Sequence, residues 1–348
     1  MLFPIDTSAA VAASLSTTLS WRDIAKRWSL RWGVGRGTSR VEPGLYRIGE
    51  PTPSSAVLVT CNYRMTVDIV RRDLADVDCW LLVLETYGVN VWCAAGKGTF
   101  GTDELARRIS AVHLADLVDH TTLVLPQLGA AGVAAQTVRE LTGYRIVWGP
   151  IRSRDLRDFL AADLNATPEM RAVTFTLAER LVLVPVELVG TLRWWWAPLV
   201  LMALAVLGRS IGTGRFAPDA ALMAAFPAVL TFAIGAMAGG LLVPALLPWL
   251  PGRAFSLKGA IAGVVLALAA LVALPGMLGM LSLWAWAAVL LGAGALASYV
   301  GVNFTGSTPY TSPSGVEREL RRAIPLQAAV LAVSLVCWTV AWATRIGA

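Results

Sequence analysis

One cysteine stands in a segment whose residue types suit contact with a flat, metal-containing cofactor. The segment 90–97 reads Asn-Val-Trp-Cys-Ala-Ala-Gly-Lys and follows a strongly apolar run, Trp80–Leu84. Cys93 has no cysteine near it in the sequence, and a soft thiolate is a good ligand for a transition metal held in a macrocycle. The next three residues are small enough for a large ring to approach. If the segment is a short helix, we expect Cys93 on its exposed face and Lys97 within reach of polar groups on a bound cofactor.

Taken alone, Cys93 has a simpler interpretation as a buried, inert thiol. The chain holds four cysteines, Cys61, Cys79, Cys93 and Cys337, with no CxxC pair and no zinc-finger spacing. They cannot supply the closely spaced thiolates of an iron–sulfur cluster. The segment Gly96–Thr99 lacks the upstream glycine of a phosphate-binding loop, because Val91 occupies that place. Two interpretations of Cys93 therefore remain, a ligand of one cofactor and a structural thiol.

Composition divides the chain into a polar part and an apolar part. Of its 348 residues 56% are hydrophobic and only 15% are charged, which is unusual for a soluble protein of this size. Beyond Arg193 the only acidic residues are Asp219, Glu317 and Glu319. The net charge of +6 is best explained by arginines that flank membrane spans, because no basic-aromatic nucleic-acid motif accompanies it. We therefore expect an N-terminal soluble domain, a C-terminal membrane domain and no nucleic-acid partner.

Strand and helix patterns alternate through the soluble part. Strands are expected at 56–60, 80–85, 121–126 and 144–148, and helices at 66–74, 102–112, 132–141 and 154–161, with Thr102 as an N-cap and Gly143 after a helix end. This alternation favours parallel βαβ units and a Rossmann-like α/β sheet. Ligands of such sheets bind at the carboxyl ends of the strands. The loops expected there are 60–65, 86–101, 127–132 and 149–153.

The N-terminal segment, residues 1–43, is expected to hold one amphipathic helix. Residues 1–20 are small and polar, with no signal peptide pattern. Between Trp21 and Trp32, the apolar residues Trp21, Ile24, Trp28 and Trp32 share one side, with arginines elsewhere. This side could pack on the soluble domain or lie on a membrane surface. Residues 33–53 read as a Gly/Pro-rich connector.

Five apolar runs predict membrane spans near 194–209, 220–247, 257–275, 278–300 and 324–344. The second is long and contains Pro227, Gly239, Gly240 and Pro244, so we expect a kink. Five basic residues, Arg253, Lys258, Arg318, Arg321 and Arg322, would lie on one side of the membrane, and three, Arg209, Arg215 and Arg345, on the other. This bias favours a cytoplasmic soluble domain. Apart from Arg209 at the end of the first span, only Lys258 among the Asp, Glu, Lys and Arg residues lies within the predicted spans, which favours an anchor over a transporter.

Several motifs together resemble the corrinoid domain of the mercury-methylating HgcA family, which is related to the large subunit of the acetyl-CoA-pathway corrinoid iron–sulfur protein. The resemblance covers residues 44–190. The matching segments of this domain are 44–49, 57–60, Asn62-Tyr63, 90–101, 125–129, 132–135 and 148–150. Beyond it, 303–307 and 314–317 resemble a loop between membrane helices of the HgcA family. The Asn90–Lys97 motif and the following membrane domain favour the HgcA family over its relative. Ala131 and Cys61 depart from the pattern, where proline and a small residue are expected, and the alternatives for Cys61 are lining the pocket or packing.

The resemblance implies a role for each matched position. Cys93 would be the lower axial ligand of the corrinoid cobalt. The cap helix beneath the corrin would consist of Asn90, Val91, Trp92, Cys93, Ala94, Ala95, Gly96 and Lys97. The cofactor pocket would be lined by Thr60, Gln127, Gly129 and Gly149.

The resemblance also implies an activity, partners and a location. The chain would be a methyltransferase that passes a methyl group from a cysteine-ligated, cobalamin-type corrinoid to Hg(II), forming methylmercury. An HgcB-like ferredoxin with 4Fe-4S clusters would supply electrons and carry Hg(II), and a methyl-folate or a methyl donor protein would supply the methyl group. The domains would be 1–43, a cytoplasmic corrinoid-binding domain at 44–190 and a multi-pass domain at 191–348 among the lipids of the cytoplasmic membrane. The alternatives are a corrinoid methyl carrier of one-carbon metabolism with another acceptor, and a membrane scaffold or transport protein.

Overall fold

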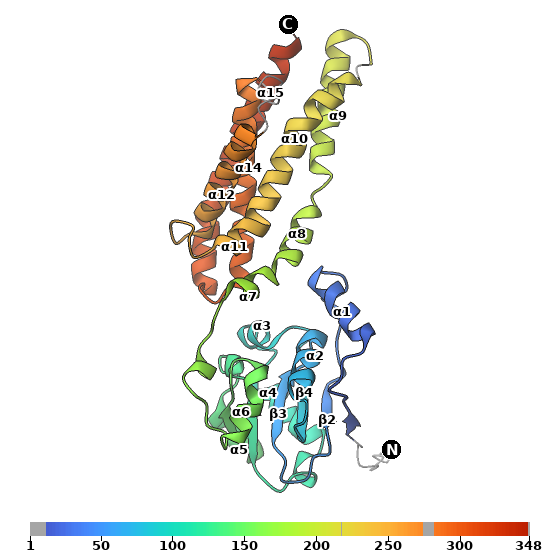
Figure 1. Cartoon of the computed structure of the whole chain (residues 1–348), viewed down its shortest axis with the longest axis vertical. Coiled ribbons are helices and arrows are strands. Elements are labelled where there is room, and N and C mark those ends of the chain that lie inside the picture. Colours follow the sequence, from blue (N-terminus) through green and yellow to red (C-terminus); the bar gives the residue numbers. More distant parts are fainter. Residues whose placement is uncertain (1–11, 217, 274–281, 347–348) are drawn as a thin grey trace, which may run out of the picture. The chain divides into compact units, whose positions relative to one another are not determined.

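The computed structural model describes residues 12–216, 218–273 and 282–346, which form two compact units (Figure 1). We call residues 12–30 and 34–174 the α/β unit, and residues 31–33 and 175–346 the helical unit. The division falls between Thr174 and Phe175. The sequence-based boundary after residue 190 falls inside a helix, Val184–Leu192.

The α/β unit contains short strands and helices in alternation. Its strands are β1 Ala13–Ser14, β2 Gly44–Ile48, β3 Val57–Cys61, β4 Cys79–Leu84, β5 Thr122–Leu125 and β6 Arg145–Trp148. Its helices are α1 Trp21–Arg31, α2 Arg64–Asp73, α3 Val91–Gly96, α4 Thr102–Ala111, α5 Ala135–Thr142 and α6 Leu156–Ala161. Short 3-10 helices are η1 Leu114–Asp116, η2 Gln127–Gly129, η3 Ser153–Asp155 and η4 Glu169–Arg171.

Within the described residues, six strands form one mixed sheet in the order β1-β2-β4-β3-β5-β6. Strands β4, β3, β5 and β6 run parallel, whereas β2 pairs antiparallel with β4. The chain passes from β3 to β4 on one side and then to β5 on the other side of β3. The strand order therefore reverses between β3 and β5, and in open α/β sheets such a reversal leaves a crevice at the carboxyl ends of the strands.

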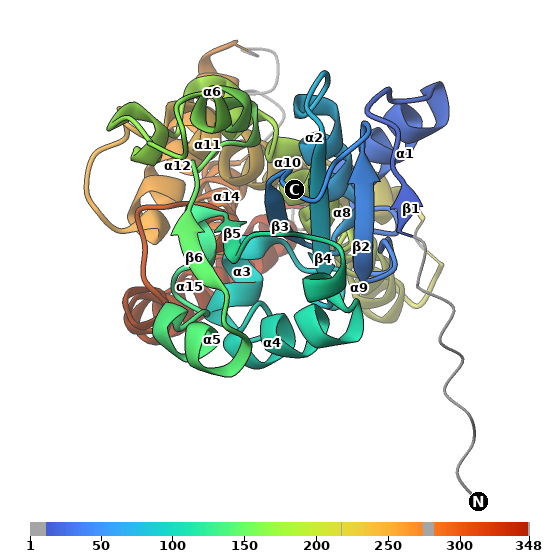
Figure 2. The same ribbon diagram turned by 90° about the horizontal axis from the view of Figure 1, so that it is seen from below.

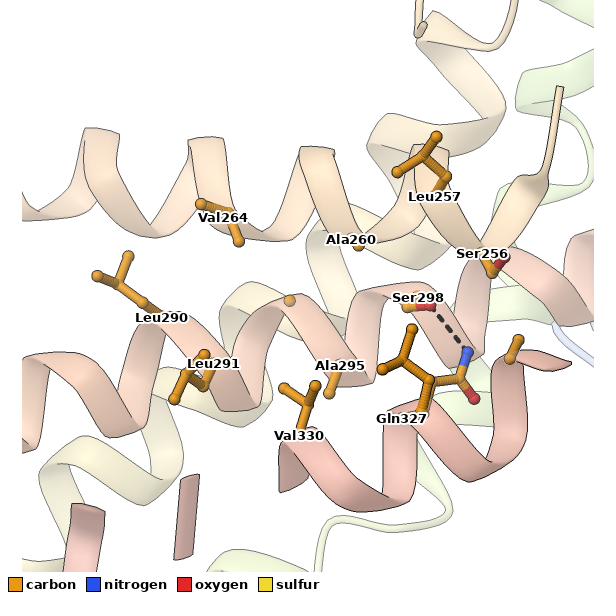
Figure 3. A pocket seen from close by; sticks show the side chains of 13 residues that line it. Ser256, Leu257, Ala260, Val264, Leu290, Leu291, Ala295, Ser298, Gln327 and Val330 are labelled. Atoms are coloured by element: carbon orange, nitrogen blue, oxygen red, sulfur yellow. Dashed lines mark hydrogen bonds between the residues drawn. The ribbon is translucent and has the colours of Figure 1, made fainter. Parts of the chain in front are cut away.

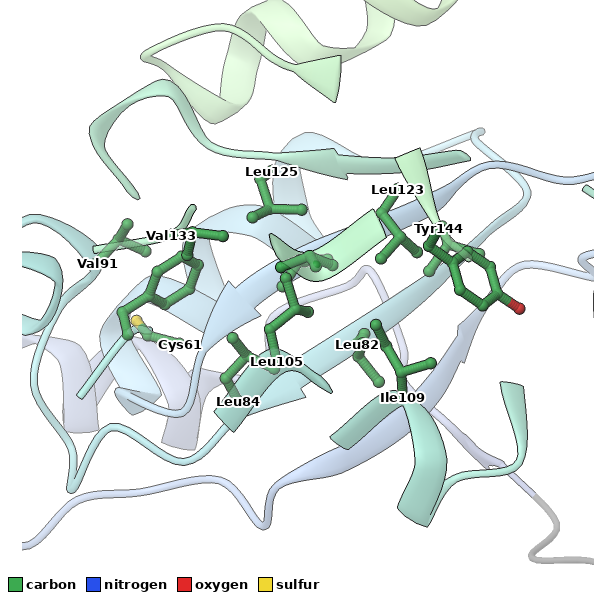
Figure 4. Close-up of a cluster of buried hydrophobic side chains, with 14 of the residues drawn as sticks. Cys61, Leu82, Leu84, Val91, Leu105, Ile109, Leu123, Leu125, Val133 and Tyr144 are labelled. Carbon is green, nitrogen blue, oxygen red and sulfur yellow. The ribbon is translucent and has the colours of Figure 1, made fainter. Parts of the chain in front are cut away.

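Alternate residues of the central strands point to opposite faces of the sheet, because side chains in a strand have a period of two. Val59 and Leu82 belong to the core beneath α4 and α5, in which Figure 4 labels Leu82. Leu58 and Leu81 belong to the core beneath α2 and α6. Figure 2 shows these two helix layers on either side of the strands. Burial on both faces explains why the central strands are continuous apolar runs.

The expected strands and helices of the α/β unit are present, with three corrections. β2 lies inside the segment that was expected to be a connector, since its five residues are flanked by glycine and proline and carry little periodic signal. The N-cap of α4 is Gly101, and Thr102 Oγ1 instead accepts a hydrogen bond from the Ala134 N–H at 2.9 Å. α5 begins at Ala135 instead of residue 132, and it ends at Gly143 in the left-handed region, as expected.

The helical unit contains α7 Leu177–Leu181, α8 Val184–Leu192, α9 Ala197–Thr213, α10 Asp219–Met237, α11 Val243–Leu246, α12 Phe255–Ala273, α14 Leu283–Asn303 and α15 Pro313–Ile346. A π-helix, η5 Ala238–Leu242, and a 3-10 helix, η6 Phe304–Ser307, complete its described elements. The π-helix contains the Gly239-Gly240 pair of the span in which a kink was expected. Gly259 and Gly263 of α12 approach the backbone of α14 so closely that an added Cβ would lie 2.2 Å and 2.7 Å from carbonyl oxygens.

Five helical segments of the described chain are long and apolar enough to cross a membrane: Leu177–Leu207, Ala225–Leu246, Phe255–Ala273, Leu283–Ser307 and Ser314–Ala343. The number agrees with the sequence analysis. The first span starts well before residue 194, so it includes Arg180 and Glu187, and the expectation that the spans contain no Asp, Glu, Lys or Arg besides Arg209 and Lys258 is wrong. The predicted start of the fourth span, residue 278, lies outside the described residues.

Candidate functional site

A cavity of about 300 Å³ lies at the carboxyl ends of the parallel strands of the α/β unit. Its lining includes Thr60 from the end of β3, Pro126 after β5 and Pro150 after β6. Leu58, Thr60 and Leu81 reach it from one face of the sheet, and Ile69 of α2 and Leu156 of α6 flank them. The cavity therefore occupies the crevice that the reversal of strand order creates.

Helix α3 contributes its first turn to this cavity. Asn90, Val91 and Trp92 line it, and the Trp92 side chain is 38% exposed. Asn90 is the N-cap residue of α3, and its Oδ1 accepts a hydrogen bond from the Cys93 N–H at 2.9 Å. Since this bond satisfies a backbone donor that the helix leaves unpaired, Asn90 fixes where α3 begins.

Cys93 is half-buried on α3, next to the residues that line the cavity but outside its lining. Its backbone carbonyl accepts a hydrogen bond from the Lys97 N–H at 3.1 Å. Lys97 ends α3 with an exposed side chain, and it too lies outside the lining. The thiol is thus held by a short, capped helix at the edge of the crevice.

Ala94 and Ala95 face the protein interior and are 0% and 4% exposed. An added Cβ at Gly132 would lie 2.9 Å from the Ala95 Cα and 2.2 Å from the Phe100 carbonyl oxygen. The small side chains of this stretch therefore allow α3 to pack closely on the segment after β5. Gly96 differs, because it is exposed and has open space around it.

The other predicted pocket residues surround the cavity without lining it. Gln127 accepts a hydrogen bond from Arg171 Nη1 through its Oε1 at 2.5 Å. Gly129 is buried against Phe100, because a Cβ added to Gly129 would lie 2.6 Å from an atom of the Phe100 ring. The Gly149 N–H donates a hydrogen bond to the Leu125 carbonyl at 2.8 Å. Each has a lining neighbour, namely Leu128 or Pro150. The four loops expected at the strand ends do converge on one cavity.

Residues of α2 and α6 also line this cavity, and sequence reasoning did not identify them. They are Thr66, Ile69, Val70 and Leu156. The expectation considered only loops at strand ends, whereas the crevice extends between two helices over the sheet. The helical spacing of 66–74, directly after a predicted site loop, is the signal that could have indicated them.

A buried amide organises the loop that leads from β4 to α3. Asn62 is 1% exposed, and its Oδ1 accepts hydrogen bonds from the Thr86 N–H at 3.1 Å and the Gly88 N–H at 3.0 Å. Its Nδ2 donates to Glu85 Oε1 at 2.8 Å. The Glu85 N–H in turn donates to Glu104 Oε1 of α4 at 2.8 Å. This network joins the end of β3, the loop and α4, and so positions the segment before Asn90.

Two other cysteines of the α/β unit have structural positions. Cys61 is fully buried in the core beneath α4 and α5 (Figure 4) and does not line the cavity, so the packing interpretation holds. Burial raises the pKa of its thiol. Burial, together with Asp78, raises the pKa of Cys79 to about 12. Neither thiol is available as a thiolate near neutral pH.

The helical unit holds a pocket of about 380 Å³ among α12, α14 and α15 (Figure 3). Its lining is apolar apart from Ser256 and one buried pair, in which Gln327 Nε2 donates to Ser298 Oγ at 2.8 Å. No ionisable side chain is among its lining residues in the described part of the chain. It has the character of a groove between packed helices, and the cavity at α3 remains the candidate site.

The sequence of the α/β unit is similar to that of known proteins. Residues 34–160 match the family described as CdhD, the CO dehydrogenase/acetyl-CoA synthase delta subunit. The gamma subunit of the acetyl-CoA decarbonylase/synthase complex of Methanopyrus kandleri is 40% identical over 127 residues, which cover 36% of this chain and 27% of that subunit.

Two further gamma subunits give similar matches. That of Methanocaldococcus jannaschii is 35% identical over 36% of this chain and 26% of the relative. That of Methanothermobacter thermautotrophicus is 31% identical over 42% of this chain and 32% of the relative. The alignments thus span about a quarter to a third of the relatives' length. The family match includes β3, the first turn of α3 and the strand ends that line the cavity.

Proposed function

We propose that this chain is a membrane-anchored corrinoid methyltransferase that transfers a methyl group to Hg(II) and forms methylmercury. The observation that carries the proposal is the position of Cys93, on a capped helix at the edge of the crevice where the strand order reverses. The similarity of residues 34–160 to subunits of acetyl-CoA-forming complexes supports a corrinoid methyl-transfer domain in this place. The Asn90–Lys97 motif favours mercury as the acceptor.

The donor set at α3 fits a metal that brings most of its own ligands. Among the described residues no group of three or more His, Cys, Asp or Glu side chains could hold a metal ion. Cys93 is a single half-buried thiol, which would supply one ligand to a cobalt whose other ligands come from a macrocycle. The cavity of about 300 Å³ is small for a whole corrinoid, so it would receive only part of the cofactor.

Each residue near α3 would then have a separate task. Asn90 holds the backbone of Cys93 and so fixes the place on α3 from which its side chain extends. Thr60, Val91 and Trp92 would contact the part of the cofactor in the cavity. Lys97 would meet polar groups at its edge. The Cys93 thiol must lose its proton when it binds a metal. When bound, the corrinoid supplies the cobalt centre that carries the methyl group, and a thiolate ligand donates electron density to it.

The cysteine pattern and the nature of the substrates support a set of partners. Its four cysteines are too far apart in the sequence for an iron–sulfur cluster, so electrons would come from a separate HgcB-like 4Fe-4S ferredoxin. Hg(II) would be the acceptor, and a methyl-folate or a methyl donor protein would recharge the corrinoid. The relatives' names describe subunits of a complex, which supports the idea of a protein partner.

The helical unit would anchor this activity in the cytoplasmic membrane. Its five apolar segments indicate a membrane protein. The excess of basic residues after the second and fourth spans would place the α/β unit on the cytoplasmic side, where thiols stay reduced.

A second candidate is a corrinoid methyl carrier of one-carbon metabolism with another acceptor. The names of the relatives favour it, since the three gamma subunits described above belong to acetyl-CoA decarbonylase/synthase complexes. It assigns no task to Cys93, so replacement of this residue would leave methyl transfer to the other acceptor intact.

The test is methylmercury formation from Hg(II) under anoxic conditions. Wild type and Cys93→Ala are each co-expressed with a ferredoxin-like partner and supplied with corrinoid and methyl donor, and the Cys61→Ala variant is the matched cysteine control. The proposal predicts product from wild type and from Cys61→Ala but not from Cys93→Ala. A wild type that retains corrinoid and yields no methylmercury would support the carrier instead.

A further inference from the structure

Helix α1 carries its apolar side outward. Trp21, Ile24 and Trp28 are 73%, 46% and 59% exposed, and their spacing of three and four residues places them on one face with the exposed Ala25. The opposite side bears Asp23, Arg27 and Leu30, of which Leu30 is fully buried. The alternative in which the tryptophans pack on the soluble domain is therefore wrong.

Ion pairs hold the polar side of α1 against α2. Asp23 Oδ1 accepts a hydrogen bond from Arg64 Nη2 at 2.7 Å, and Asp23 Oδ2 lies 2.9 Å from Arg71 Nη2. Arg71 is 5% exposed and also pairs with Asp68 at 2.9 Å, while its Nη1 donates to the Ser16 carbonyl. These contacts fix the rotation of α1, so the outward direction of its tryptophans is built into the fold.

The charges beside this face are basic. Arg22 and Lys26 are exposed, and the Arg22 guanidinium lies 5.5 Å from the centre of the Trp21 ring. The one acidic residue of the helix, Asp23, is on the opposite side in its ion pairs. Tryptophan is enriched at the headgroup level of bilayers, and basic residues next to it attract anionic lipids.

We propose that α1 is an interfacial helix that lies on the anionic surface of the membrane in which the chain is anchored. Two observations favour lipid over a protein partner. The same chain has five segments suited to cross a bilayer, so a membrane surface is available at high local concentration. The face also combines tryptophan with flanking cations, which is the composition of membrane-surface helices. The proposal does not depend on the corrinoid assignment.

Quenching of tryptophan fluorescence by lipids with brominated acyl chains tests this proposal in the full-length protein. The signal of Trp21 and Trp28 is the difference between wild type and the Trp21→Phe/Trp28→Phe variant, which keeps the face apolar. The proteins are reconstituted into nanodiscs of phosphatidylcholine and phosphatidylglycerol, with and without bromine. Trp80, which is 7% exposed in β4, provides the control difference through Trp80→Phe.

The proposal predicts that brominated lipid lowers the fluorescence of Trp21 and Trp28, measured as the α1 difference between wild type and the double variant, severalfold. The fluorescence of Trp80, measured in the same way, should stay nearly unchanged. Removal of phosphatidylglycerol, or the Arg22→Gln/Lys26→Gln variant, should weaken the quenching. An α1 difference that is equal in brominated and ordinary lipid would overturn the proposal. If that difference instead shifts only when an iron–sulfur partner is added, the face binds protein.

Discussion

Cys93 owes its position to the residues around it more than to its own contacts. The Asn90 side chain caps α3 through the Cys93 N–H, and the backbone of Ala95 lies close against Gly132. The sequence motif indicated a small-residue segment with an outward thiol. It did not indicate that the alanines face inward, because the facing residue, Gly132, is 37 positions away from Ala95 in the sequence.

Two glycines near α3 should respond differently to the same substitution. In Gly132→Ala the new methyl would overlap the Phe100 carbonyl and the Ala95 backbone, so we expect a loss of about 1–3 kcal/mol in the free energy of unfolding. In Gly96→Ala the methyl meets open space, so we expect no loss or a gain of about 0.5–1 kcal/mol. Thermal unfolding followed by circular dichroism checks both. Equal effects would contradict the packing described for α3.

The cap of α3 is testable at Asn90. Asn90→Ala removes the acceptor for the Cys93 N–H and should cost about 1 kcal/mol locally, whereas Asn90→Asp keeps an acceptor and should cost little. We expect the alanine variant to retain less corrinoid after gel filtration and the aspartate variant to resemble wild type. If both variants retain corrinoid as wild type does, the cap has no role in holding Cys93.

At the scale of elements, hydrogen-bonded side chains connect strands, loops and helices whose mutual positions the sequence does not reveal. Asn62 connects the end of β3 to the loop before α3, and Asp23 connects α1 to α2. Strand and helix types were predictable from their apolar patterns. The pairing of β2 was not, because five residues between glycine and proline do not reveal a strand that pairs antiparallel with β4. The tryptophan side of α1 was predictable, but its direction depends on Asp23.

The attachment of α1 should depend on pH. Burial alone would raise the pKa of Asp23, but hydrogen bonds from Ser20 and Arg71 outweigh it and lower the pKa from 3.8 to about 2. A carboxyl whose pKa is lower in the folded state stabilises the fold above its unfolded pKa, and this contribution is lost as the pH falls from about 3.8 to about 2. After allowance for solvent screening the effect is on the order of 1 kcal/mol.

Amide hydrogen exchange of residues 20–31 measures this effect. At pH 6 the Asp23→Asn variant should exchange faster than wild type, and the difference should shrink as the pH approaches 2. A difference that stays constant over this range would show that the charge of Asp23 does not hold α1.

At the scale of the whole molecule, the chain joins an α/β unit to a unit with five apolar segments. The number of spans was predictable from hydropathy. The start of the first was not, because Leu177–Trp194 mixes apolar residues with Glu179, Arg180, Glu187 and Arg193, which lowered its apparent hydrophobicity. Arg180 is accommodated through hydrogen bonds to the Pro244 and Ala245 carbonyls at 2.8 Å and 3.2 Å.

The membrane assignment predicts how the full chain leaves cell membranes. Alkaline carbonate releases peripheral proteins, so the wild-type chain should stay in the pellet and require detergent. Protease added to spheroplasts should spare the α/β unit and cleave it in inverted vesicles. Release by carbonate would contradict the spans, and cleavage in spheroplasts would contradict the proposed sidedness.

The absorption spectrum of the full-length protein with bound corrinoid, recorded under anoxic conditions, tests the central claim most directly. The claim is that Cys93 is a ligand of the corrinoid cobalt. We expect Cys93→Ala to fold as wild type does, because the half-buried position accepts alanine within a helix, and to bind corrinoid with an absorption spectrum that lacks the thiolate–cobalt features. A variant spectrum identical to that of wild type, at equal corrinoid content, would contradict the claim.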